Sequence, residues 1–171
     1  MSRRRLEGAV FDLDGVITRT ARIHAESWKQ LFDAFLRDRA EAHDDLFEPF
    51  STEDYRLYVD GRPRIEGVLA FLASRGITLP TGEDTDPPGQ STAWALGNRK
   101  NEIFQQMVRM RGVEILHDTI AFIERLKREG VKVGVASSSR NCSLILEVAG
   151  KTDLFDAQVD GVESKRLQLE G

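Results

Sequence analysis

The sequence predicts an α/β fold in which a parallel β-sheet is interrupted, after its first strand, by a helical insert. Short apolar runs typical of buried strands lie near the two ends of the chain, at residues 9–11 and 131–135. Between them, apolar side chains recur at helical spacing, as at Trp28, Leu31 and Phe32. Strand, helix and strand follow one another between residues 131 and 160, as in the right-handed βαβ units that build parallel sheets.

The individual elements follow from these patterns and from the breaks between them. We expect strands over residues 6–14, 131–139 and 154–162, and helices over 21–38, 64–77, 96–110, the segment ending at Gly130, and 141–150. Ile103, Met107 and Met110 share one face of the third helix. Residues 78–92, rich in Pro, Gly and acids, are the expected loop, and residues 43–63 mix acids and aromatics, with a turn at Gly61 and Pro63. The core is therefore placed at residues 1–18 and 96–171, and the helical insert at 19–95.

The composition argues against several functional classes. The 171 residues carry a formal net charge of −4 and contain no long basic block, which argues against a general nucleic-acid binder. The single cysteine, Cys142, has no second cysteine with which to form an internal disulfide. No apolar run approaches the roughly 20 residues that span a membrane, and the N-terminus lacks an apolar secretory core. We therefore expect a cytoplasmic protein with neither nucleic acid nor membrane as a partner.

Polar residues follow the apolar runs of the first two expected strands. Asp12 and Asp14 come at the end of the first run, and Ser137 ends the second. Because ligands of open parallel sheets bind beyond the carboxyl ends of the strands, we expect these residues to converge. An Asp-x-Asp-Gly segment alone is more often a capped turn, and a serine-rich strand end is more often a helix N-cap. The occurrence of both, each after a strand, favours a functional site.

The two aspartates suggest metal-assisted phosphoryl transfer. Carboxylates this close repel each other unless a cation neutralises them. Mg²⁺, a hard ion that takes oxygen ligands and often arrives with a phosphate, would meet this need at Asp12 and Asp14. Asp12 would attack phosphorus to form an aspartyl phosphate, and Asp14 would exchange protons with the leaving and accepting oxygens. The Ser137 hydroxyl and backbone N–H groups near Ser139 and Asn141 would hold phosphate oxygens.

These segments resemble two motifs of the haloacid dehalogenase superfamily. "FDLDGVIT" at 11–18 resembles motif I, "VASSSRN" at 135–141 resembles motif II, and nearly the whole chain resembles the β-phosphoglucomutase-like members. The resemblance implies a Rossmann-like core with an inserted helical cap, and a Mg²⁺-dependent enzyme acting on a small phosphorylated sugar. It implies Asp12 as the nucleophile, Asp14 as the general acid/base and Ser137 as the motif II hydroxyl. The other phosphate- or substrate-binding residues implied near these motifs are Gly15, Thr20, Ser138, Ser139, Arg140 and Asn141.

The insert resembles the family's cap domain. "TARIHAESWK" resembles the first cap helix, whose histidine assists the acid/base aspartate; this implies that role for His24 and a place near the substrate for Trp28. "VDGRPR" resembles the loop whose arginine grips the distal phosphate, which implies Gly61 and Arg64. "LGNRKN" resembles the segment whose lysine contacts phosphate and sugar, which implies Lys100 and Asn101. Taken singly, these residues have plainer interpretations as polar helix, core or solvated surface positions.

Two features depart from the family's pattern. Close relatives usually carry an acid at position 19; because Arg19 lies between core and cap, we expect it to alter cap closure or phosphate affinity. The family also needs a motif III lysine and a motif IV acidic pair. Lys165 is followed by Arg-Leu-Gln instead of Pro-x-Pro-Asp, so we do not expect it to be catalytic. We expect the chain to be a truncation of a longer protein, inactive and prone to associate by itself.

The expected reaction is the isomerisation of glucose 1-phosphate to glucose 6-phosphate through the aspartyl phosphate. The alternative is a small-molecule phosphatase of the same superfamily, acting on a sugar phosphate or a phosphoglycolate-type substrate, in which water takes the phosphoryl group. A more remote alternative is a non-catalytic, phospho-accepting regulatory domain. Such domains place the accepting aspartate on a later strand and lack a large insert after the first.

Overall fold

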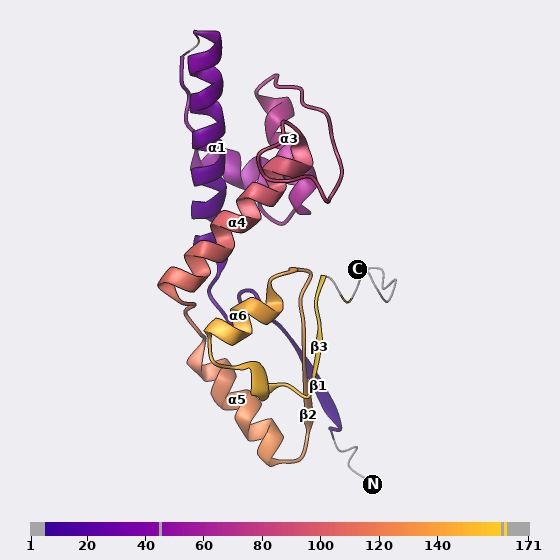
Figure 1. Ribbon diagram of the computed structural model, residues 1–171. Coiled ribbons are helices and arrows are strands. Elements are labelled where there is room, and N and C mark those ends of the chain that lie inside the picture. The colour runs from indigo at the N-terminus through magenta and orange to yellow at the C-terminus, as the bar shows by residue number, and fades with distance from the viewer. Residues whose placement is uncertain (1–5, 45, 162, 164–171) are drawn as a thin grey trace. The chain divides into compact units, whose positions relative to one another are not determined.

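The chain divides into two compact units, which the computed structural model describes over residues 6–44, 46–161 and 163. The core unit comprises residues 1–21 and 108–171, and the cap unit comprises residues 22–107 (Figure 1). Both divisions lie later in the chain than the predicted boundaries at residues 18 and 95. The predicted second boundary falls inside α4 (Ala93–Arg111), an unbroken helix, so no change of backbone conformation marks it.

The core unit is built on a parallel sheet with the strand order β1-β2-β3. The strands span Gly8–Asp12, Lys132–Ala136 and Ala157–Val159. In the central strand β2, the buried side chains of Val133 and Val135 alternate with more exposed positions. The described strands confirm the predicted α/β class with a parallel sheet.

Two α-helices and a 3₁₀ turn accompany the sheet in the described part of the core unit. α5 spans His117–Arg128 and contacts β2, and α6 spans Cys142–Val148. The 3₁₀ turn η2 spans Thr152–Leu154. On α5 the buried side chains recur at i, i+3 and i+6, as the sequence predicts, and are Ile120, Ile123 and Leu126.

The cap unit is helical throughout its described elements, in agreement with the predicted helical insert. Its helices are α1 (Ala21–His43), α2 (Thr52–Asp54), the π-helix η1 (Tyr55–Val59), α3 (Arg64–Ser74) and α4. Aromatic rings fill its core: the Phe32 ring lies 4.1 Å from Phe71 and 5.0 Å from Phe50, and all three side chains are buried. These contacts fix α1 against α3 and hold the helices that carry the candidate cap residues.

Two local features of the structure were not anticipated from the sequence. Residues 52–59, to which the sequence assigned no regular element, form α2 and η1, because Ser51 and Asp54 form a reciprocal capping box that starts the helix. Met110 is 85% exposed, although it shares a helical face with the buried Met107. It lies in the last turn of α4, where little of the chain packs against it.

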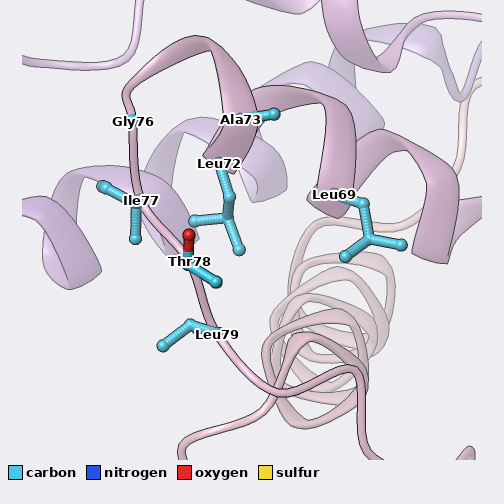
Figure 2. A pocket seen from close by; sticks show the side chains of 7 residues that line it. All are labelled: Leu69, Leu72, Ala73, Gly76, Ile77, Thr78 and Leu79. Atoms are coloured by element: carbon cyan, nitrogen blue, oxygen red, sulfur yellow. The ribbon is translucent and has the colours of Figure 1, made fainter.

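An open groove of about 490 Å³ lies in the cap unit between α3 and the segment that follows it (Figure 2). Its lining is almost wholly apolar and consists of Leu69, Leu72, Ala73, Gly76, Ile77, Thr78 and Leu79. None of the residues predicted to bind substrate lines this groove. Among the described residues, no helix combines the length and the apolar character needed to cross a lipid bilayer.

Candidate functional site

The carboxyl ends of the three strands bring Asp12, Ser137 and Asp160 to one edge of the sheet. In the parallel register Asp12 pairs with Ala136, and Ala136 pairs with Val159. Ser137 and Asp160 directly follow these last two residues, and the Ser137 amide donates to the Val159 carbonyl at 2.9 Å. The expected convergence of Asp12 and Ser137 is therefore present. Asp160, which is only 9% exposed, joins them and was not predicted as a site residue.

A tight loop after β1 positions the second aspartate. The Leu13 carbonyl accepts from the amides of both Ile17 and Thr18 at 3.0 Å, which closes the loop on itself. Gly15 adopts φ +80°, a left-handed conformation that glycine takes without strain. The half-buried Asp14 carboxylate accepts from the hydroxyl of Thr20, which is fully buried. Thr20 thus orients Asp14, while Asp12 is exposed at the strand end.

The loop after β2 is held by its own serine hydroxyls. Ser137 Oγ accepts from the Ser139 amide, and Ser139 Oγ accepts from the Asn141 amide, both at 3.1 Å. A hydroxyl that accepts in this way keeps its own proton for donation, so Ser137 can donate to an oxygen at the strand end. Ser138 and Arg140 are exposed, whereas Asn141 is buried and precedes the first residue of α6.

Gly161 permits a close approach between two parts of this edge. A Cβ atom at Gly161 would lie 2.3 Å from the carbonyl oxygen of Ser138, well inside ordinary contact. The Gly161 amide also donates to the Ser139 carbonyl at 3.3 Å. The residue after Asp160 is therefore packed directly against the serine loop.

Arg19 forms an ion pair that the sequence did not reveal. Its amide donates to the Glu114 carbonyl at 2.9 Å, and its guanidinium Nη1 lies 3.0 Å from Glu114 Oε1. The neighbouring Thr18 pairs with Ile115 in an antiparallel bridge. The positive charge of Arg19 is thus matched by an acid on the second connecting segment, 95 residues away in sequence. No pattern within one sequence identifies such a distant partner.

Carboxylates dominate the electrostatics of this edge. Burial raises the pKa of the Cys142 thiol to about 12, with further contributions from the negative charges of Asp160, Asp14 and Asp12. Cys142 is thus a buried, protonated side chain of α6 that reports a concentration of negative charge. A cation would relieve this repulsion.

A second cluster of predicted residues lies within the cap unit. Lys100, on α4, is only 4% exposed, and its Nζ lies 2.8 Å from Nδ1 of His24 on α1. The ammonium also lies 5.1 Å from the ring centroid of Trp28. Nearby, Arg64 Nη2 at the start of α3 donates to Asn101 Oδ1 at 3.0 Å. Five predicted residues are therefore joined through α1, α3 and α4.

The surroundings of His24 keep its imidazole uncharged. Burial, together with the positive charges of Lys100 and Arg64, lowers the pKa of His24 to about 3. An ammonium group has only donors, so Nδ1 accepts from Lys100 and the imidazole proton lies on Nε2. His24 is thus a neutral ring with one nitrogen committed to Lys100 and one N–H available to donate.

Three more residues shape the cap cluster. Gly61, at φ +70°, forms part of the exposed turn before α3. Gly97, which was not predicted, lets α4 approach α3, since a Cβ atom there would lie 3.2 Å from Arg64 Cδ. Phe104, also not predicted, stacks on His24; its spacing of four residues from Lys100 was the available sequence signal. Lys165 lies outside the described residues.

Comparison with known proteins places the chain in a family. Residues 6–168 match the haloacid dehalogenase-like hydrolases. The chain belongs to this family. It is 38% identical over 168 residues to a β-phosphoglucomutase from Mycobacterium bovis, a match that covers 98% of this chain and 64% of that protein. It is 30% identical over 156 residues to the β-phosphoglucomutase of Bacillus subtilis, covering 91% of this chain and 61% of that protein.

The fold has close counterparts among solved structures. A β-phosphoglucomutase from Clostridium difficile superposes with a TM-score of 0.65 at 23% identity, covering 93% of this chain and 63% of that one. This likeness concerns the fold and agrees with the predicted Rossmann-like core with a helical cap. The chain spans less than two thirds of the length of the curated relatives it matches. The resemblance to the superfamily and its β-phosphoglucomutase-like members is confirmed.

The residues of the sheet edge fit a hard divalent cation. Asp12 and Asp14 supply carboxylate oxygens, the donors that Mg²⁺ prefers. Over the described residues, no group of three or more His, Cys, Asp or Glu side chains forms a metal site on its own. A site with two carboxylates suits Mg²⁺, which completes its shell with waters and substrate phosphate oxygens.

Proposed function

We propose that this protein catalyses Mg²⁺-dependent phosphoryl transfer on a sugar phosphate through an aspartyl phosphate on Asp12. The observation that carries the proposal is the parallel register that sets Asp12 beside the end of β2, where Ser137 follows. An exposed nucleophile and a hydroxyl donor then share the edge at which ligands of parallel sheets bind. The family match over residues 6–168 and the similarity to β-phosphoglucomutases support the same chemistry.

The candidate site residues of the core unit divide the steps of this reaction among them. An Asp12 carboxylate oxygen forms a bond to phosphorus while the bond to the sugar oxygen breaks. Asp14, oriented by Thr20, gives a proton to the departing sugar oxygen and takes one from the oxygen that later attacks the aspartyl phosphate. Ser137 donates to a phosphate oxygen, and the adjoining loop of Ser138, Ser139, Arg140 and Asn141 surrounds the group. Mg²⁺ held by Asp12 and Asp14 would neutralise phosphate charge.

The cap cluster supplies charge for a second phosphate. Lys100 and Arg64 are cations on neighbouring helices, and Asn101 holds the Arg64 guanidinium. Arginine binds phosphate with its planar fork of donors, and lysine binds it as a point charge. Neutral His24 offers an Nε2–H donor for the proton transfer that the family resemblance assigns to it, and Trp28 and Gly61 help to form the sugar site. A second phosphate site is what a mutase working through a sugar bisphosphate requires.

The favoured reaction is therefore isomerisation of β-glucose 1-phosphate to glucose 6-phosphate, in the manner of the β-phosphoglucomutases. Phosphatase activity on a sugar phosphate is the second candidate, because the matching family is described as hydrolases. The two differ only in whether a sugar hydroxyl or water takes the phosphoryl group from Asp12. A cap cluster with two cations favours the sugar bisphosphate and hence the mutase.

One assay separates the candidates. The protein, expressed from its whole reading frame, is incubated with Mg²⁺, β-glucose 1-phosphate and a glucose 1,6-bisphosphate primer. Glucose 6-phosphate and inorganic phosphate are measured in parallel. We expect glucose 6-phosphate to exceed inorganic phosphate and both to vanish in Asp12→Asn. Phosphate release without isomerised sugar selects the phosphatase, and product formation by Asp12→Asn contradicts the proposed chemistry.

A matched pair of variants tests the second phosphate site. Arg64→Met removes the proposed phosphate-binding guanidinium, whereas Arg56→Met removes an arginine on η1 whose side chain is 71% exposed. We expect Arg64→Met to raise the KM for the bisphosphate at least roughly tenfold, the loss typical of a charged hydrogen bond. Arg56→Met should leave this KM unchanged, and equal effects of the two variants contradict the assignment.

A further inference from the structure

Two helices of the cap unit face each other with matching pairs of side chains. His24 and Trp28 lie four residues apart on α1, and Lys100 and Phe104 lie four residues apart on α4. Residues at this spacing lie on the same face of a helix. Each helix therefore contributes one nitrogen-bearing polar side chain and one aromatic ring to a single cluster.

Phe104 contacts both polar members of this cluster. Its ring stacks on the His24 imidazole, with centroids 4.1 Å apart and planes inclined by 22°. The same ring lies 4.8 Å from Lys100 Nζ. Phe104 is fully buried, so water does not reach the face of the imidazole that it covers. The ammonium meets the faces of Phe104 and Trp28, which attract a cation electrostatically.

We propose that Phe104 is a positioning residue that holds the His24 ring in the plane where Nδ1 meets Lys100 and Nε2–H is left to donate. Without the stacked ring, the imidazole is free to rotate about its side-chain bonds, and the contact of Nδ1 with Lys100 is no longer enforced. Phe104 touches no reacting atom in this scheme and acts only through His24 and Lys100. The kinetic part of the inference rests on the function proposed above, and the structural part stands without it.

The contrasting interpretation is that Phe104 only fills space. Phe71 serves as the comparison, because it is equally buried and its ring packs against a different pair of rings, those of Phe32 and Phe50. Replacing either ring by leucine removes similar volume from the cap unit. Effects of lost packing are therefore common to Phe71→Leu and Phe104→Leu. Effects on the state of His24 belong to Phe104 alone.

The first test reads the protonation of His24 by NMR of protein labelled with ¹⁵N-histidine. In the wild type we expect the ring proton on Nε2 and no titration down to about pH 4, since the pKa of His24 is lowered to about 3. The charged groups that act on His24 are Lys100 and Arg64, and both are kept in every variant. In Phe104→Leu we expect the pKa of His24 to rise by at least about one unit and the two tautomers to mix. Phe104→Tyr and Phe71→Leu should behave as wild type.

Several outcomes overturn the proposal. In the wild type, the proposal fails if the His24 ring proton lies on Nδ1, or if no nuclear Overhauser contact joins the rings of His24 and Phe104. In the variants, it fails if the His24 titration is unchanged in Phe104→Leu, or if the same shift appears in Phe71→Leu. Phe104→Met is the second variant, because the flexible methionine side chain fills irregular gaps and preserves folding; it should reproduce the Phe104→Leu result.

The second test uses the reaction itself. We expect Phe104→Leu to lower kcat roughly tenfold or more with a smaller change in KM, because misplacing a proton donor affects the transition state first. Phe104→Tyr, which keeps an aromatic ring at this position, should retain the wild-type kcat. If no variant or wild type isomerises sugar, the proposed function fails while the NMR result still decides the role of Phe104. If the NMR shift appears and kcat does not change, His24 is positioned by Phe104 but does not assist catalysis, and the kinetic part is wrong.

Discussion

Replacing His24 by glutamine should remove a pH dependence from the stability of the cap unit. The pKa of His24 is lowered from 6.5 to about 3 by burial and by the charges of Lys100 and Arg64. The unfolded chain therefore binds a proton at this residue between pH 6.5 and 3, and the folded chain does not. Because proton uptake favours the state that binds the proton, the free energy of unfolding falls as the pH falls through this window.

The size of the effect follows from the same values. At pH 7 the His24 side chain of the unfolded chain is mostly neutral, so its protonation lowers the free energy of unfolding only slightly. At pH 5 its protonation stabilises the unfolded chain by about 2 kcal/mol relative to pH 7, since each unit below the unfolded pKa contributes about 1.4 kcal/mol. The neutral glutamine of His24→Gln lacks this contribution. All other ionisable groups are shared, so their effects cancel when the two proteins are compared.

Urea unfolding followed by tryptophan fluorescence measures this difference. Both tryptophans of the chain, Trp28 and Trp94, lie in the cap unit that contains His24, so the signal reports on that unit. We expect wild type to lose about 2 kcal/mol more stability than His24→Gln between pH 7 and pH 5. His43→Gln, a change at the exposed end of α1, should follow wild type. Equal losses in wild type and His24→Gln would refute the assignment of a neutral, buried His24.

Two further variants test the core unit. Gly161→Ala places a Cβ atom 2.3 Å from the Ser138 carbonyl oxygen, so the serine loop must move by roughly 1 Å, a displacement that lowers kcat/KM about 100-fold. Gly89→Ala, where nothing lies within 4 Å of the added Cβ atom, is the control, and similar kinetics for the two variants would count against a role for the loop. Arg19→Asp sets like charges against Glu114 and should change kcat or KM, and adding Glu114→Arg should restore both. Unchanged kcat and KM in Arg19→Asp would remove any functional role for the Arg19–Glu114 pair.

Much of the fold could be predicted because its signals are local. The alternating valines of β2 and the spacing of Ile120, Ile123 and Leu126 on α5 each reflect burial on one face of one element. The convergence of Asp12 and Ser137 could be predicted because ligands of parallel sheets bind beyond the carboxyl ends of the strands. The helical turns over residues 52–59 were not predicted, because they start at a capping box of Ser51 and Asp54 within a segment that mixes acids and aromatics.

The residues that escaped prediction act through contacts between distant segments. Glu114 matches Arg19 from the other connecting segment, and Phe104 matters because α1 brings His24 onto its ring. Gly161 is required by the nearby Ser138 carbonyl, which a sequence pattern does not display. The low pKa of His24 likewise depends on burial and on two cations from other helices. Such effects follow from the packing of the folded chain.

Trapping the phosphorylated enzyme tests the central claim most directly. The protein is mixed with Mg²⁺ and glucose 1,6-bisphosphate carrying radiolabelled phosphate, quenched in acid, digested and sequenced by mass spectrometry. We predict label on the peptide containing Asp12, release of that label by hydroxylamine as expected for an acyl phosphate, and no label in Asp12→Asn. Label on Ser137 or any other side chain, or label that persists in Asp12→Asn, would contradict the account.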